Sequence, residues 1–170
     1  MRNTLRIALL ASSFFTLQAS AENIGLIGFH GGWGFPKSTP GVSGGLDYGF
    51  QAEWAMSTIV NAGVFWSYQF LNNDAGTSSY EMPFGALINL NIMEGPGLYL
   101  GINVGAARVG SGEGSAAEST THFSGGGQIG FDYPLTNTIA GGLECRFISI
   151  ATELESTYVI NTNGHLKYYF

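Results

Sequence analysis

Residues 46–54 read LDYGFQAEW and alternate strictly between two kinds of residue. Every even-numbered residue in it is apolar, and every odd-numbered residue is polar or glycine. Successive side chains of a β-strand point to opposite faces, so the stretch presents one apolar face and one polar face. A helical period of 3.6 residues cannot produce this alternation. The stretch therefore predicts a strand whose two faces meet different surroundings.

The same alternation recurs along the chain and predicts eight strands of 11 to 13 residues. Residues 62–70, 123–133 and 158–170 show it clearly, and four other runs show it less regularly. The expected strands cover residues 24–34, 44–54, 60–70, 80–91, 98–109, 122–133, 138–150 and 158–170. Strands of soluble sheets are usually shorter, whereas about 9 to 11 tilted residues cross the hydrocarbon core of a membrane. These strands are long enough to span a bilayer.

Charged residues follow the alternation as well. Seven of the eight charges within the expected strands share the polar parity: Asp47, Glu53, Glu81, Asp132, Glu144, Arg146 and Lys167. Arg108 alone falls on the apolar parity. The apolar set therefore behaves as a lipid-facing surface. Because only helices and closed barrels satisfy the backbone within a bilayer, the sequence predicts an all-β fold, an eight-stranded antiparallel up-and-down transmembrane β-barrel.

The connections between the expected strands alternate in length. Residues 35–43, 71–79, 110–121 and 151–157 form longer connections, and residues 55–59, 92–97 and 134–137 form shorter ones. Outer-membrane barrels have long extracellular loops and short periplasmic turns. We therefore assign the longer set to the cell exterior and both chain ends to the periplasmic side.

The first 21 residues have the pattern of a secretory signal peptide. Arg2 and Arg6 precede an apolar run over residues 7–17, and small residues follow at 19–21. The barrel domain is then expected over residues 22–170. That part has four basic residues against twelve acids, a net charge of −8, which disfavours nucleic acid as a partner. Only 11% of the whole chain is charged, compared with about 25% in soluble domains. The expected location is the outer membrane of a Gram-negative bacterium.

Three stretches carry a family resemblance: residues 96–105 (PGLYLGINVG), 127–136 (GQIGFDYPLT) and 166–170 (LKYYF). They resemble the small outer-membrane β-barrels of the opacity-protein and outer-membrane-protein-A-like kind. The resemblance implies that Phe170, with Tyr168 two residues before it, forms the signal read by the barrel-assembly machinery. Members of that family include adhesins, envelope-stabilising proteins and a few lipid-modifying enzymes, so the resemblance leaves the function open.

The interior of an eight-stranded barrel is about wide enough for side chains to fill, which disfavours a water-filled pore. An antiparallel pairing that joins residue 139 near residue 170 would bring Glu144 within reach of His165 or Lys167. Buried charges need partners, so these residues are interpreted as an interior network rather than a proton or ion path. Its expected members are Glu53, Glu81, Asp132, Glu144, Arg146, His165 and Lys167.

Catalytic and metal sites receive little support from the sequence. His122 and Ser124 have the His-x-Ser spacing of lipid A deacylases, but they carry lumen parity and lie on a different strand from the pair in that family. The three histidines lie on separate expected strands without a cysteine or carboxylate at ligand spacing. Cys145 has lipid-facing parity and no second cysteine to pair with. We therefore expect no enzyme activity, no metal and no cofactor.

Two functions remain open. The first is a structural role in envelope integrity, with outer-membrane lipid and lipopolysaccharide as partners. The second is adhesion or resistance through the extracellular loops, with an extracellular protein as partner. The expected loops are short and acidic, with Lys37 against five acids: Asp74, Glu113, Glu118, Glu153 and Glu155. Anionic partners favour basic surfaces, so the structural role is preferred and a lipid A-modifying activity ranks last.

Overall fold

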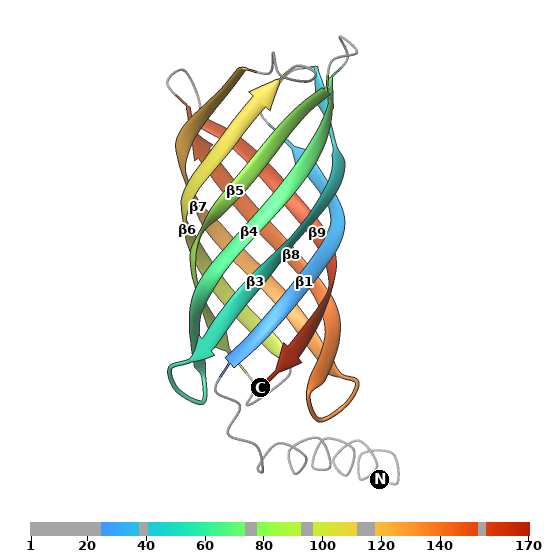
Figure 1. The fold of residues 1–170 in the computed structure, drawn as a ribbon, viewed down its shortest axis with the longest axis vertical. Helices are drawn as coiled ribbons and strands as arrows, with labels where there is room; N and C mark the ends of the chain where they lie inside the picture. Colours follow the sequence, from blue (N-terminus) through green and yellow to red (C-terminus); the bar gives the residue numbers. More distant parts are fainter. Residues whose placement is uncertain (1–24, 38–40, 74–77, 93–96, 112–117, 153–155) are drawn as a thin grey trace, which may run out of the picture.

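A computed structural model describes residues 25–37, 41–73, 78–92, 97–111, 118–152 and 156–170. These residues form a barrel of long tilted strands (Figure 1). The strands are β1 (Gly25–Pro36), β2 (Val42–Ser43), β3 (Gly45–Ala55), β4 (Val60–Asn73), β5 (Ser78–Asn91), β6 (Leu98–Ser111), β7 (Glu118–Pro134), β8 (Ile139–Ala151) and β9 (Ser156–Tyr169). Within the described ranges, no helix has the length and hydropathy needed to cross a bilayer.

The eight long strands close into a ring by antiparallel pairing between neighbours. Each long strand pairs with the next one along the chain, and β1 pairs with β9 to close the barrel. The closing seam runs from Leu26 opposite Tyr169 to Pro36 opposite Val159. The start of β1 and the end of β9 lie at the same end of the barrel, at the foot of Figure 1. The predicted eight-stranded antiparallel barrel is confirmed.

Two features of the strands differ from the prediction. β7 has 17 residues and begins at Glu118, whereas the alternation predicts residues 122–133. The two-residue strand β2 lies within the expected loop 35–43 and pairs with the end of β4. Gly41, just before β2, has a φ of 76°, a left-handed conformation that glycine adopts without strain. Strands therefore continue beyond the alternating region, because backbone pairing does not require an apolar outer face.

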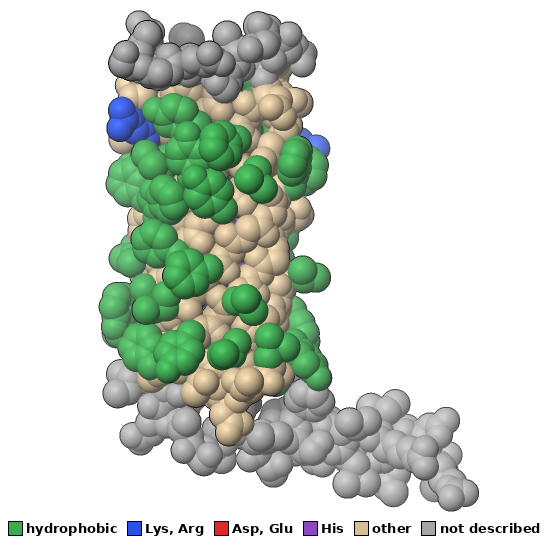
Figure 2. All heavy atoms as spheres, turned by 45° about the vertical axis from the view of Figure 1, so that its right-hand side comes forward, with side chains coloured by type: hydrophobic (Ala, Val, Ile, Leu, Met, Phe, Trp, Pro, Cys, Tyr) green, Lys and Arg blue, Asp and Glu red, His purple; other side chains and the backbone are tan. Residues whose placement is uncertain are grey.

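The two faces of the wall carry different side chains. Large hydrophobic residues point outward, and Ile102, Phe29 and Leu143 are 65%, 64% and 71% exposed. Figure 2 shows hydrophobic and uncharged atoms over the wall, with Lys and Arg side chains only near its upper end. The seven charged residues of polar parity are all buried inside, whereas Arg108 is exposed. The alternation therefore predicts correctly which face is which.

The lumen is polar over most of its length and becomes apolar toward the loop end. Ala107, Ile148 and Ile150 form a buried cluster against which Val109 packs. These residues belong to the outer parts of β6 and β8, next to the longer connections. The alternation assigns them to the lumen without showing that they meet there. The inner wall toward the loop end therefore carries packed apolar side chains in place of the polar groups found elsewhere in the lumen.

Candidate functional site in the barrel lumen

An ion pair in the lumen joins two inward residues of β8. Arg146 Nη2 lies 2.8 Å from Glu144 Oε1. Residues two apart on a strand point to the same face, which places both side chains inside. The second carboxylate oxygen, Oε2 of Glu144, accepts a hydrogen bond of 2.7 Å from the Tyr99 hydroxyl on β6. Both charged side chains are almost completely buried, so each compensates the charge of the other.

Arg146 also reaches across the lumen to two other strands. Its Nη2 atom donates a hydrogen bond of 3.0 Å to Gln51 Oε1 on β3. Gln51 Nε2 in turn donates to Glu53 Oε1 at 2.8 Å. The guanidinium carbon lies 5.0 Å from the ring centroid of Phe65 on β4, in cation–π contact range. These contacts tie opposite parts of the wall together through the interior.

Asp132 on β7 takes three partners from β9. Lys167 Nζ donates to its Oδ2 atom at 2.9 Å, and the Tyr169 hydroxyl donates to the same atom at 3.3 Å. The Nε2 atom of His165 forms a short contact with Oδ1. Gly142 on the intervening strand β8 leaves room for this group, because a Cβ there would lie 2.7 Å from His165 Nε2. The carboxylate therefore links two strands that do not pair with each other.

Tyr99 connects the Glu144 and Asp132 groups. Its hydroxyl donates to Glu144, and Lys167 Nζ lies 3.9 Å from its ring centroid. Only 1% of Tyr99 is exposed. Gly130 on β7 makes space for the ring, because a Cβ there would lie 2.2 Å from Tyr99 Cζ. The polar parity of residue 99 on β6 is the signal that could have identified this lumen aromatic.

The pairing of β8 with β9 lies close to the expected register, but the expected direct contact of Glu144 is not formed. Residue 139 pairs with Tyr168 rather than with residue 170, a shift of two positions. Glu144 lies opposite Asn163 and forms its ion pair with Arg146 of its own strand, not with His165 or Lys167. Tyr99 lies between Glu144 and Lys167, so these two side chains are joined through the tyrosine rather than by a direct contact. Contacts across the lumen depend on the stagger of several strands, which pairwise alternation does not define.

Six of the seven residues expected in the interior network join one chain of contacts, through Gln51 and Tyr99: Glu53, Glu144, Arg146, Asp132, His165 and Lys167. Glu81 lies apart on β5, where it is buried opposite Gln69 and Val109. Among the hydrogen bonds and ion pairs of the described residues, none joins Glu81 to the other six.

A second polar group, centred on Asp47, was not recognised from the sequence. The Ser67 hydroxyl donates to Asp47 Oδ1, and Asn163 Nδ2 donates to Oδ2 at 2.8 Å. His30 Nε2 lies 3.3 Å from Ser67 Oγ. The residue types are those of a catalytic triad, but a nucleophilic serine needs its hydroxyl proton directed to histidine. Ser67 and Asp47 are 0% exposed, so this group has the geometry of a structural core.

The other candidate for catalysis is not assembled either. His122 Nε2 lies 2.7 Å from the Thr120 hydroxyl, and Ser124 is buried on the inner wall. Within the described ranges, no group of three or more His, Cys, Asp or Glu residues is placed to hold a metal ion.

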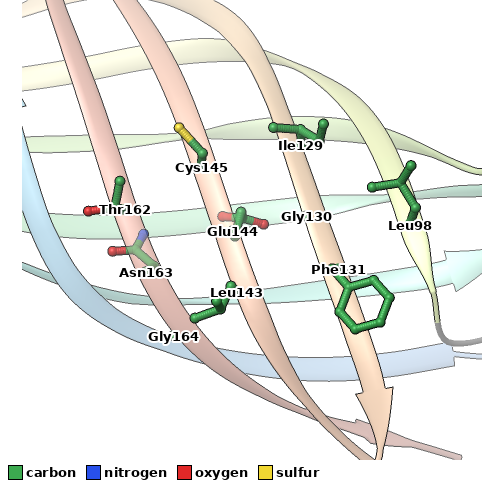
Figure 3. Close-up of a pocket in the computed structure, with 10 residues that line it drawn as sticks. All are labelled: Leu98, Ile129, Gly130, Phe131, Leu143, Glu144, Cys145, Thr162, Asn163 and Gly164. Carbon is green, nitrogen blue, oxygen red and sulfur yellow. The ribbon is translucent and has the colours of Figure 1, made fainter.

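A surface hollow of about 550 Å³ crosses β6 to β9 on the wall (Figure 3). Leu98, Ile129, Phe131 and Leu143 contribute most of its hydrocarbon lining, and exposed Cys145 lies beside them. Of the polar residues that border it, Glu144 and Asn163 are buried and bind lumen partners, so the hollow is lined mainly by hydrocarbon.

Tyr168 and Phe170 lie at the foot of the barrel with their rings stacked, the centroids 6.4 Å apart. Both side chains are about half exposed. The backbone of Phe170 exchanges two hydrogen bonds with Gly25, of 3.0 and 3.1 Å. Phe170 therefore makes the last backbone pair of the seam that closes the barrel.

Deleting Phe170 should reduce the yield of folded barrel and increase the degraded or aggregated fraction. The deletion removes two seam hydrogen bonds and the terminal aromatic ring. Heat-modifiable gel migration of unboiled membranes measures the folded fraction, and Phe170→Tyr serves as a control that keeps an aromatic end. Equal folded yields from the deletion and the full chain would contradict this expectation.

Comparison with known proteins agrees with this architecture. A family model described as outer membrane protein beta-barrel domain matches residues 7–170. The chain belongs to this family. The resemblance found in the sequence is thereby confirmed at the level of small outer-membrane barrels. Comparison with curated proteins gives no sequence match.

Solved structures of other outer-membrane barrels have the same fold. Neisserial surface protein A superposes with a TM-score of 0.68 at 14% identity, covering 86% of this chain and 97% of that one. OprG from Pseudomonas aeruginosa gives 0.55 at 12% identity, covering 87% and 97%. Ail, the attachment invasion locus protein of Yersinia pestis, solved with the heparin analogue sucrose octasulfate, gives 0.51 at 13%, covering 86% and 99%. Sequence identities of 12 to 14% show a shared fold and leave the function to be argued from the residues of this chain.

Proposed function

We propose that this protein is a structural component of the Gram-negative outer membrane that supports envelope integrity and forms no open pore. Residues 1–21 would direct export as a signal peptide; they lie outside the described residues. The barrel-assembly machinery would insert the chain, and outer-membrane lipid and lipopolysaccharide would surround it. No catalytic role, metal or cofactor is part of the proposal.

The observation that supports a barrel without an open pore is the chain of side-chain contacts across the lumen. From Glu53 through Arg146 and Tyr99 to Asp132, side chains of β3, β6, β7, β8 and β9 meet in the interior. An eight-stranded barrel has little space beyond its own side chains, and the apolar cluster toward the loop end adds a second obstruction. Ion conduction would require these buried pairs to separate.

Attachment is the alternative function, suggested by the name of Ail, the attachment invasion locus protein of Yersinia pestis. The heparin analogue in that structure is a polyanion, whose recognition calls for a cationic surface. The expected loops of this chain carry five acids against exposed Lys37. Four of those acids lie outside the described residues. The charge balance favours the structural role, while a cationic or protein partner would suit the acidic loops.

The proposed function is tested in a strain that lacks the gene. We expect increased entry of a normally excluded antibiotic or dye and unchanged attachment to coated surfaces, with permeability and attachment measured side by side. The purified barrel, reconstituted in planar bilayers, should show no steady ion conductance. A loss of attachment with intact permeability would favour the adhesin, and stable open channels would contradict the closed-lumen proposal.

A further inference from the structure

Arg108 is the exception to the charge pattern of the barrel wall. The other seven charges of the predicted strands are buried in the lumen, whereas the Arg108 side chain on β6 is exposed on the outer face. An arginine keeps its charge under all physiological conditions, so it cannot enter hydrocarbon as a neutral group. Its position must therefore place the guanidinium where a negative charge or water is available.

The distance of Arg108 along the barrel axis from the start of β6 indicates where its guanidinium lies. It lies ten residues beyond Leu98, the first residue of β6 at the periplasmic end. At a rise of about 3.3 Å per residue and a tilt of about 40°, ten residues advance about 25 Å along the barrel axis. The apolar band of such barrels is also about 25 Å tall. Arg108 therefore lies at the outer boundary of the hydrocarbon, at the level of the lipid headgroups.

The guanidinium is held against the wall rather than free in solution. Arg108 Nε and Nη2 both donate to the Ser119 hydroxyl on β7, at 2.9 and 2.7 Å. The ion pairs found among the described residues do not include Arg108. Nη1 makes none of these contacts and remains available to a further acceptor. The cation is thus oriented by neutral groups.

Aromatic side chains lie beside this position on the same face. The ring of Tyr80 on β5 lies over Gly110, where a Cβ would be 2.5 Å from Tyr80 Cζ. Gly110 is the next outward residue after Arg108 on β6. Tyr80 also stacks on Tyr68 of β4, with centroids 5.5 Å apart. Tyrosine rings at the interface combine an apolar body with a polar hydroxyl, as a lipid headgroup region requires.

We propose that Arg108 binds the phosphate of an outer-leaflet lipid, with Ser119 orienting the guanidinium and Tyr80 flanking it. A phosphate fits because it offers an anionic acceptor to the fork-like donors of arginine at the depth where lipid phosphates lie. The inference rests on the proposed outer-membrane location and gives the surrounding lipid a defined contact on the barrel. It does not depend on the lumen network.

The test uses the full-length barrel folded in maltoside micelles, which contain no phosphate, with native mass spectrometry to measure bound lipid. The probes are diphosphorylated lipid A, the same lipid A after removal of its phosphates, and inorganic phosphate. Arg108→Gln should weaken binding of lipid A about tenfold, because it removes one charge-assisted contact. Ser119→Ala should weaken it less, and Lys37→Gln, which changes another exposed cation, should leave it unchanged.

Heat-modifiable migration of each variant verifies that the barrel is folded. If Arg108→Gln does not fold, Arg108→Lys and Ser119→Ala carry the test, and both should bind lipid A more weakly than the unchanged protein. Equal binding by these variants, or equal binding of dephosphorylated lipid A, would overturn the proposal. Displacement of lipid A by an equal concentration of inorganic phosphate would assign the contact to free anion instead. None of these results alters the permeability test, so failures of the two proposals are distinguishable.

Discussion

Glu144→Gln is expected to lower the free energy of unfolding by about 3 to 5 kcal/mol, because it leaves the buried Arg146 charge without its ion-pair partner. Arg146 is 1% exposed, and Glu144 Oε1 lies 2.8 Å from its Nη2 atom. The substituted amide keeps the size of the side chain and an acceptor for Tyr99, so loss of charge is the main change. Urea unfolding of the barrel in lipid vesicles measures the effect.

Two comparisons isolate the charge pair from the general cost of changing a lumen acid. Glu81→Gln alters another buried carboxyl, which forms no ion pair among the described residues, and should be less destabilising. The double variant Glu144→Gln with Arg146→Gln should regain part of the lost stability, since no uncompensated charge remains. Equal losses from Glu144→Gln and Glu81→Gln would show that the ion pair has no special role.

Leu143→Arg is expected to cost about 2 to 4 kcal/mol, as a cation near the middle of the hydrocarbon does in transmembrane barrels. Leu143 is adjacent to Glu144 in sequence but lies on the opposite face, with 71% of its surface exposed. It stands four residues beyond the start of β8, about 10 Å into the apolar band at the rise and tilt of such strands. Folding yield and unfolding in vesicles measure the loss.

The matched control is Leu135→Arg, in the turn after β7. Leu135 is also largely exposed, but it lies beyond the end of the strand, at the periplasmic interface. The cost of an arginine falls to about 0 to 1 kcal/mol near the interface, so the difference between the two variants reports depth. If Leu143→Arg proved as mild as Leu135→Arg, the outer face of β8 would not contact hydrocarbon.

Much of the fold can be predicted from this sequence because a membrane barrel has a simple two-faced wall. The stretch around Asp47 and Glu53 shows which parity faces the lumen, and the burial of both side chains agrees. The bounds of β7 were underestimated because its first residues lie beyond the alternating region. The backbone there still pairs with its neighbours, but its outer face does not need to be apolar.

The interior contacts could be predicted in kind but not in detail. Parity identifies the buried charges, yet Lys167 meets Asp132 across an intervening strand, and Glu144 meets Tyr99 on a strand distant in sequence. Such partners follow from the stagger and closure of the whole ring. Tyr99 carries no charge that marks it as a network member, yet a buried inward tyrosine has a hydroxyl that must find an acceptor.

The contact between Asp132 and the last strand has a consequence for the order of events during biogenesis. All three partners of this carboxylate belong to β9, so no earlier part of the chain can neutralise it in the same way. If the barrel closes with β9 out of register, Asp132 enters the lumen without these three partners and its charge stays uncompensated. Correct pairing of β9 supplies the partners and closes the seam with β1 in one step. The lumen contacts of Asp132 therefore favour a ring in which β9 has its native register.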